Sequence, residues 1–411
     1  MSGAPSVRRA EPSETPLPTL AGNMALGVTQ IILWGGTFFL VAVVSGPIVA
    51  STGWPQAMVV GALSLAIFVS GLPAPFVGRM IRGHGGRPVL VIGAVIVAAG
   101  LALMAVAPTL PVFLLAWVIA GLGMSASLYD PLFAAIGQAY GTAARGAMTQ
   151  IAISSGFAVS LCWPATSFLV DQVGWRGACL TYAILCALVV APLYAWALPS
   201  LRRTPAERSE PTRPYEPAGS QEAARLPAER LLAVTFAMAA MIMTAVSVQL
   251  LQLLQTMGVA STTAVALTGL IGPAQVGVRV VELAFGRRAH PAWSLLLSGA
   301  SVGLGLLLLA TLPSLAWLAM LLYGAGNGMR TVVRGTLPLA LYGQREYAAV
   351  MGRLARLPLL GQAVTPVACG YIAEWFGLVP LLYTMLVVAT INLGLSIVVF
   401  GYALRRADGP A

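Results

Sequence analysis

The sequence of 411 residues contains no lysine, and all 23 of its basic side chains are arginine. The absence of lysine excludes a P-loop ATPase, which needs a lysine on the phosphates, and Schiff-base chemistry, which needs a side-chain amine. Charge of either sign is scarce, because charged residues make up only 9% of the chain. Any work that this protein performs must therefore draw its energy from a gradient or from a partner.

Histidine and cysteine are also rare, with two and four copies. His84 and His290 lie in predicted loops, and the cysteines at 162, 179, 186 and 369 have the spacing of neither a zinc site nor a redox pair. Intramembrane proteases and prenyl-transfer enzymes need histidine or acidic metal ligands, or a serine with a base. The sequence supplies none of these sets, so we expect no enzyme, no catalytic residue, no metal site and no cofactor.

What the chain has in abundance is apolar sequence, with 58% hydrophobic residues and a mean hydropathy of +0.86. Stretches of about 20 apolar residues are long enough to cross the hydrocarbon of a bilayer. We expect twelve such spans, at 24–48, 55–80, 88–107, 111–138, 146–170, 177–198, 231–256, 261–284, 291–311, 314–342, 348–374 and 378–403. The sequence therefore predicts an all-α integral membrane protein.

The net charge of +10 reflects the membrane and not nucleic acid. If the N-terminus is cytoplasmic, nearly all arginines outside the spans fall in cytoplasmic connections, and Arg176 alone falls on the other side. Positively charged loops remain on the cytoplasmic side during insertion. We therefore expect a multi-pass protein of a bacterial inner membrane, with both termini cytoplasmic.

The predicted domains follow from one long polar interruption and from an internal repeat. We expect a disordered tail at 1–21, six-helix bundles at 22–198 and 230–405, a flexible linker at 199–229 and a tail at 406–411. Gly121-x-Gly123 recurs as Gly324-x-Gly326, and Pro73-Ala74 followed by Arg79 recurs as Pro273-Ala274 followed by Arg279. Related halves of this kind place a transporter's substrate site between them, near the membrane midplane.

Spans 3, 6, 9 and 12 contain no charged residue, whereas spans 4, 8, 10 and 11 hold Asp130, Arg279, Arg330, Arg334, Arg353 and Arg356. This pattern, the loop from Gly78 to Pro88 and the junction from Asp171 to Arg176 resemble the major facilitator superfamily over residues 22–405. The resemblance implies two pseudo-symmetric six-helix bundles, with spans 1, 4, 7 and 10 lining a central cavity. The loop departs from the family pattern, because Arg82 occupies the position of an aspartate and Gly83 that of an arginine.

Within that superfamily, Trp34-Gly35-Gly36-Thr37-Phe38-Phe39, Gly53-Trp54 and the arginines of spans 8 and 11 are similar to the bacterial branch near the monocarboxylate and oxalate/formate transporters. This resemblance implies that the substrate is a small anion.

Arg330, Arg334 and Asn327 lie on one face of span 10 because they are spaced by three and four residues. The two guanidinium groups repel each other unless an anion lies between them, and a carboxylate matches the fork of donors on arginine. We interpret both arginines and Asn327 as substrate-binding. The alternative is that Arg334 pairs with Asp130 and only holds the halves together.

Asp130 is the only acid inside a span and away from its ends. Beside an arginine it can be ionised when paired and protonated when unpaired, which is the property of a proton-coupling site. A purely structural ion pair remains the other interpretation.

The remaining candidates are gating residues and polar groups of the cavity helices. Arg79, Arg82, Arg87, Arg279 and Glu282 are predicted to gate, with a substrate role as the alternative for Arg279. Gln30 and Trp34 of span 1, Gln249 and Gln252 of span 7, and Tyr129 are predicted to contact substrate, with helix–helix hydrogen bonding as the alternative. Arg353 and Arg356 are explained by reaching toward the membrane interface.

These features together predict a secondary transporter. It is expected to move a small organic anion by alternating access, coupled to protons, as a monomer. An efflux carrier for toxic organic compounds or metalloid oxyanions is the alternative, and a channel suits the paired buried charges less well.

Overall fold

The computed structural model describes residues 18–199, 219–285 and 289–407, and every regular element within these ranges is a helix. The predicted all-α class is therefore confirmed. The N-terminal half contains α1 (Leu20–Gly36), α2 (Leu40–Thr52), α3 (Gln56–Gly71), α4 (Ala74–His84), α5 (Gly86–Ala105), α6 (Leu110–Ser127), α7 (Tyr129–Tyr140), α8 (Ala144–Ser155), α9 (Ala158–Leu185) and α10 (Ala191–Ala197). The C-terminal half contains α12 (Gly219–Thr256), α13 (Ser261–Gly269), α14 (Ile271–Phe285), α15 (Pro291–Thr311), α16 (Ala316–Phe376) and α17 (Leu378–Ala407).

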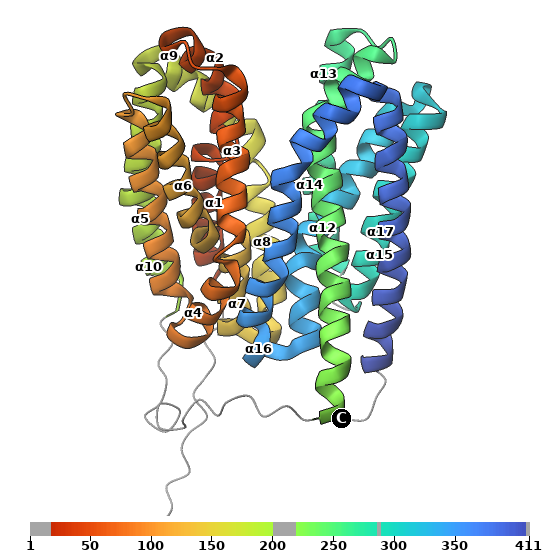
Figure 1. The fold of residues 1–411 in the computed structure, drawn as a ribbon. Helices are drawn as coiled ribbons and strands as arrows, with labels where there is room; N and C mark the ends of the chain where they lie inside the picture. Colours follow the sequence, from red (N-terminus) through yellow and green to blue (C-terminus); the bar gives the residue numbers. More distant parts are fainter. Residues whose placement is uncertain (1–17, 200–218, 286–288, 408–411) are drawn as a thin grey trace, which may run out of the picture.

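The helices form two bundles that stand side by side, with α1–α10 in one and α12–α17 in the other (Figure 1). The largest cluster of buried apolar side chains, which includes Phe113 and Trp117, is built mainly by the first bundle. A second cluster, which includes Leu254 and Val302, belongs to the other bundle. Helices α5, α10, α15 and α17 lie on the outer flanks (Figure 1) and belong to the predicted spans without charged residues, as expected for helices that face lipid.

The internal repeat is visible in how the helices pack. A Cβ atom on Gly121 of α6 would lie 2.5 Å from the carbonyl oxygen of Ala66 in α3. One on Gly324 of α16 would lie 2.8 Å from the carbonyl oxygen of Ile271 in α14. Both glycines therefore allow the same close approach of two backbones at equivalent places in the two halves, which supports the predicted pseudo-symmetry.

The number of membrane spans remains a prediction. Among the described residues, eight helical segments are long and apolar enough to cross a membrane, or nine if α3 and α4, bent by 49°, count as one span. One of these segments, Leu110–Ser155, has 46 residues, and α16 has 61 residues with a break in helical geometry at Gly343 (φ 71°, ψ 168°). A single crossing needs only about 20 residues, so long segments of this kind hide further crossings from a simple count.

The predicted linker differs from the structure at its C-terminal end. Helix α12 begins at Gly219, so residues 219–229 of the predicted linker are helical. Glutamate, alanine and arginine dominate this stretch and favour helix, and Pro227 is accommodated within it. The rest of the predicted linker and most of the two predicted tails lie outside the described residues.

The two bundles meet near one end of the molecule, where Arg82 of α4 contacts Glu346 of α16. We call this end the closed end. The ribbons of the two bundles diverge toward the opposite end, and the start of α12 and the end of α17 lie at the same end as the contact (Figure 1). The described conformation is therefore the one in which the two bundles are joined at the closed end.

Candidate functional site

An ion pair between Asp130 and Arg334 joins the two bundles. Nη2 of Arg334 lies 2.6 Å from Oδ2 of Asp130, and the two side chains are 25% and 14% exposed. Asp130 is in the first turn of α7, where the helix dipole stabilises a negative charge and where Pro131 is tolerated. The chain leaves helical geometry at Leu128, between α6 and α7, so the predicted fourth span is broken next to its acid. The pair of Arg334 with Asp130, the alternative interpretation of Arg334 in the sequence analysis, is therefore present.

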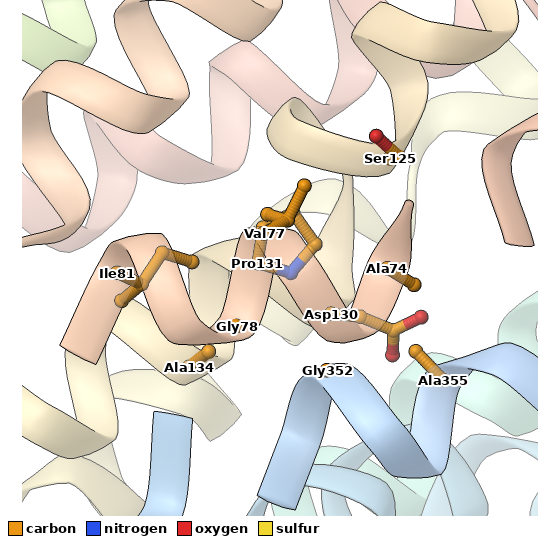
Figure 2. A pocket seen from close by; sticks show the side chains of 10 residues that line it. All are labelled: Ala74, Val77, Gly78, Ile81, Ser125, Asp130, Pro131, Ala134, Gly352 and Ala355. Carbon is orange, nitrogen blue, oxygen red and sulfur yellow. The ribbon is translucent and has the colours of Figure 1, made fainter. Parts of the chain in front are cut away.

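The second oxygen of Asp130 has different surroundings. Oδ1 is buried and has no hydrogen-bond partner among the described residues. Asp130 also lines a small cavity between α4, α6, α7 and α16 (Figure 2). One carboxylate thus pairs with a cation through one oxygen, while its other oxygen has no partner among the described residues and the side chain borders a cavity.

Arg330 is a buried cation that contacts no acid in the described residues. Arg330 is 9% exposed, and its Nη1 donates a hydrogen bond to the carbonyl oxygen of Ala239 in α12 at 2.9 Å. Nη2 is buried without a hydrogen-bond partner, and so is the hydroxyl of Tyr323, two helical turns earlier in α16. Two hydrogen-bond donors are therefore available close together in the C-terminal bundle.

Arg279 has all three guanidinium nitrogens engaged. Nε and Nη2 donate to the carbonyl oxygen of Gly328 at 3.3 Å and to the hydroxyl of Thr331 at 3.0 Å, both in α16. Nη1 donates across the bundle interface to the carbonyl oxygen of Ala152 in α8 at 2.7 Å. A cation held in this way is a fixed contact between the halves, which favours the gating interpretation of Arg279.

The residues near Arg279 extend this contact between α8 and the C-terminal bundle. Glu282 is buried one turn further along α14, within electrostatic reach of Arg279 and of Arg145 in α8. Arg145 itself donates to the carbonyl oxygen of Ala289 at 2.7 Å. Burial and the nearby Arg145 lower the pKa of His290, whose Nδ1 accepts the backbone N–H of Ala292 at the start of α15. The predicted gating pair Arg279 and Glu282 is thus brought together.

The closed end contains an ion pair of which the sequence analysis predicted only one residue, Arg82. Nη1 of Arg82 lies 3.2 Å from Oε2 of Glu346, and the side chains are 38% and 33% exposed. Nε2 of Gln344 donates to the carbonyl oxygen of Gln138 at 2.6 Å in the same region. Glu346 was not among the predicted residues. Because Arg82 occupies the position where the family has an aspartate, an acidic partner for it on another helix could have been expected, and Glu346 of α16 is that partner.

The other predicted gating arginines are less engaged. Arg79 is exposed, with its guanidinium 5.9 Å from the ring centre of Phe76, and Arg87 is exposed as well. Arg79 therefore does not share the buried environment of Arg279, its counterpart in the repeat.

Trp34 and Tyr129 come together beside Asp130. The ring of Trp34 stacks on Phe38 at 4.3 Å between centres and lies 5.7 Å from the ring of Tyr129. The hydroxyl of Tyr129 is hydrogen-bonded to that of Ser155, and Nε1 of Trp34 is buried without a partner in the described residues. An aromatic cluster with one unpaired donor among the described residues is therefore formed in the N-terminal bundle by Trp34, Phe38 and Tyr129, the residue before Asp130.

The predicted amide residues have separate positions. Gln30 is fully buried in the N-terminal bundle, where Nε2 donates to the carbonyl oxygen of Ser127 at 3.1 Å and to the hydroxyl of Tyr194 at 2.7 Å. This environment favours helix packing as the role of Gln30. Gln249 of α12 and Asn327 of α16 are buried, and Gln252 is exposed.

The arginines of the last part of α16 fit their interfacial interpretation. Arg353 and Arg356 are both exposed, and Arg353 makes two hydrogen bonds to Glu229 of α12, at 2.6 and 2.9 Å. This pair lies within the C-terminal bundle and ties its helices to each other.

The sequence matches the family model of the Major Facilitator Superfamily over residues 24–355 and matches no curated protein. The fold is similar to that of the human organic anion transporter MFSD10 (TETRAN), with 17% identity, a TM-score of 0.69 and coverage of 94% of this chain and 100% of that one. It is similar to the proton:xylose symporter XylE, with 15% identity, a TM-score of 0.68 and coverage of 94% and 95%. It is also similar to the E. coli fucose:proton symporter FucP, with 13% identity, a TM-score of 0.66 and coverage of 92% and 98%. At these identities the likeness establishes the fold alone.

Proposed function

Since this chain belongs to the Major Facilitator Superfamily, a family of membrane transporters and not of enzymes, we propose that it is a secondary active transporter for a small organic anion of the monocarboxylate type. It moves this anion by alternating access between the two bundles and couples the movement to protons.

The observation that carries the anion proposal is the state of Arg330. Arg334 has Asp130 as its counter-charge, and the three nitrogens of Arg279 are all hydrogen-bonded. Arg330 is buried, and within the described part of the chain its guanidinium bonds only to a backbone carbonyl, through one nitrogen. A buried cation without a counter-ion is strongly destabilising, and a carboxylate that accepts from its free nitrogen removes that penalty. The similarity to a protein named as an organic anion transporter agrees with this substrate class.

Asp130 supplies the proposed coupling. While Asp130 is ionised it neutralises Arg334, and once it is protonated the attraction between the two side chains is lost. Arg334 can then bind the carboxylate of the substrate together with Arg330, one turn away on α16. Proton and anion consequently bind together, which is the relationship that a symporter needs. XylE and FucP, two of the proteins of similar fold, are named as proton symporters.

The contacts across the bundle interface supply the proposed gate. Arg82 with Glu346 and Arg279 with the carbonyl oxygen of Ala152 connect the halves, so both must separate when the closed end opens. The proposed cycle therefore alternates between the described conformation and one in which these contacts are broken.

The test is uptake of labelled carboxylates into proteoliposomes that contain the purified full-length protein, with and without an imposed pH gradient. Lactate, pyruvate and acetate are suitable monocarboxylate probes, and xylose and fucose are the matched neutral probes. We expect accumulation of at least one carboxylate that depends on the pH gradient. Proton-driven uptake of a sugar without uptake of any carboxylate would refute the anion proposal and retain a secondary transporter.

We further propose that the protein is a monomer in a bacterial inner membrane with both termini on the cytoplasmic side, as the arginine-rich connections indicate. A reporter fused to the C-terminus is then expected to be cytoplasmic, and one inserted at Gly258 to be external. The reverse result would overturn the orientation.

A further inference from the structure

A cavity lies against Asp130 where α4, α6, α7 and α16 meet (Figure 2). Its volume of about 10 Å³ is at the lower limit for a cavity that holds one water molecule. Asp130 and Ser125 supply its polar side chains, and the rest of its lining is apolar or glycine. The cavity is thus small, mostly apolar and next to an ionisable group.

The cavity accounts for the two different oxygens of Asp130. Oδ2 is bonded to Arg334 at 2.6 Å, whereas Oδ1 is buried without a hydrogen-bond partner among the described residues. A buried carboxylate oxygen that lacks a partner is destabilising, and water is the usual partner where the protein supplies none. A water molecule in this cavity would donate to Oδ1.

The cavity extends from Asp130 toward the closed end. On α7 its lining continues one turn beyond Asp130 to Ala134, and on α4 it runs from Ala74 through Gly78 to Ile81, near the end of that helix at His84. Arg330 is not part of the lining. The lining of the cavity therefore reaches from Asp130 to Ile81, the residue before Arg82 of the closed end, without including Arg330.

We propose that this cavity binds a water molecule on Oδ1 of Asp130 and that this water carries the proton between Asp130 and the closed end, apart from the route of the anion. The inference rests on the proposed coupling role of Asp130. In the step, the water donates a proton to Oδ1 and recovers one from the aqueous side, so the carboxylate becomes neutral while the water is unchanged. Arg334 then loses its counter-charge and becomes available to the substrate carboxylate.

Within the described part of the chain, the titratable groups around Asp130 belong to a single helix, α16. Arg334 and Tyr347, both of α16, are the groups that interact with it electrostatically, and the hydroxyl of Tyr347 is occupied because it donates to the carbonyl oxygen of Gly335 at 2.8 Å. The residues that α4 contributes to the cavity are apolar or glycine. Proton exchange at Oδ1 therefore depends on the cavity itself and not on a relay of acidic side chains.

The experiment follows the protonation of Asp130 directly and needs no substrate. Purified full-length protein in lipid nanodiscs is subjected to a pH jump, and the carboxylic-acid band that is absent from Asp130→Asn is followed by time-resolved infrared spectroscopy. Ala355→Val places an apolar group in the cavity, and Ala355→Thr places a group of the same size that carries a hydroxyl. Ala349→Val, at a buried position on α16 that does not line the cavity, is the packing control.

We expect Ala355→Val to slow the protonation of Asp130 by roughly tenfold, because it excludes the water. The protonation rates of Ala355→Thr and Ala349→Val should lie much closer to that of the unaltered protein. Ala134→Val fills the cavity from α7 and replaces Ala355→Val if that variant does not fold. Equal rates in the Val and Thr variants, or an effect of Na⁺ on the Asp130 band that mimics protonation, would overturn the water route. If no band titrates in any variant, the coupling role of Asp130 fails as well, and the two failures are thereby distinguished.

Discussion

At the scale of single residues, the proposed binding of an anion depends most on Arg330. Arg330→Lys keeps the positive charge but loses the fork of donors, so we expect carboxylate transport to fall by roughly tenfold or more, since one lost charge-assisted hydrogen bond is worth about 1.5–3 kcal/mol. Arg330→Gln should abolish transport. Initial rates in proteoliposomes at matched protein amounts measure both. Arg176→Lys, which changes an arginine bonded to the carbonyl oxygen of Ala107 far from the site, is the control. Unchanged rates in both Arg330 variants would leave Arg330 a structural residue.

For Asp130, an experiment can distinguish a role in proton coupling from a purely structural role. Asp130→Asn imitates the protonated acid, so a coupling residue should retain substrate exchange across the membrane and lose accumulation driven by a pH gradient. A structural acid behaves differently, because its loss leaves Arg334 as an unpaired buried charge at a penalty of about 3–5 kcal/mol. Thermal unfolding in detergent and the two transport modes are measured in Asp130→Asn and in the double variant with Arg334→Gln. Recovery of stability only in the double variant would assign the pair to structure alone.

At the scale of the helices, Gly78 determines how closely α4 approaches α16. A methyl group on Gly78 would lie 2.5 Å from the carbonyl oxygen of Ala348 and 2.8 Å from Cα of Gly352, and backbone atoms cannot move aside as side chains do. We expect Gly78→Ala to push the two helices apart and to deplete the conformation that is joined at the closed end. Gly83→Ala, on the same helix with nothing within 4 Å, is the matched control. The distance between spin labels at His84 and Arg345, both exposed at the closed end, should lengthen in Gly78→Ala alone, and equal distances in the two variants would contradict the prediction.

The sequence predicted the helices and the ion pair well because both depend on local spacing and on the repeat. Hydrophobic length identified the helical class, and the shift between the halves placed Pro131, the residue after Asp130, opposite Arg334. The pairing of Asp130 with Arg334, one of the two interpretations of Arg334, is observed at 2.6 Å. Periodicity does not say which neighbour a side chain meets, so Gln30 and Trp34, one turn apart on α1, were assigned to the same surface. Gln30 is bonded inside the N-terminal bundle, whereas Trp34 stacks on Phe38. Glu346 was overlooked because it lies between two predicted spans. An acid outside a span has no desolvation penalty and therefore does not indicate a functional site.

At the scale of the whole molecule, the ion pair between Arg82 and Glu346 is a weak element of a large conformational equilibrium. Both side chains are about one-third exposed, and pairs of this kind contribute roughly 0.2–1 kcal/mol. Arg82→Glu puts two acids in contact and should therefore shift the equilibrium away from the joined closed end by only a few-fold, less than Gly78→Ala does. Arg82→Glu combined with Glu346→Arg restores an attractive pair with reversed polarity and should return the equilibrium to its original position. Spin labels at His84 and Arg345, both exposed at the closed end, report the populations through the distribution of distances between them. If the double variant stays as shifted as the single one, the pair does not hold the bundles together, and the backbone contact between α4 and α16 alone keeps this end closed.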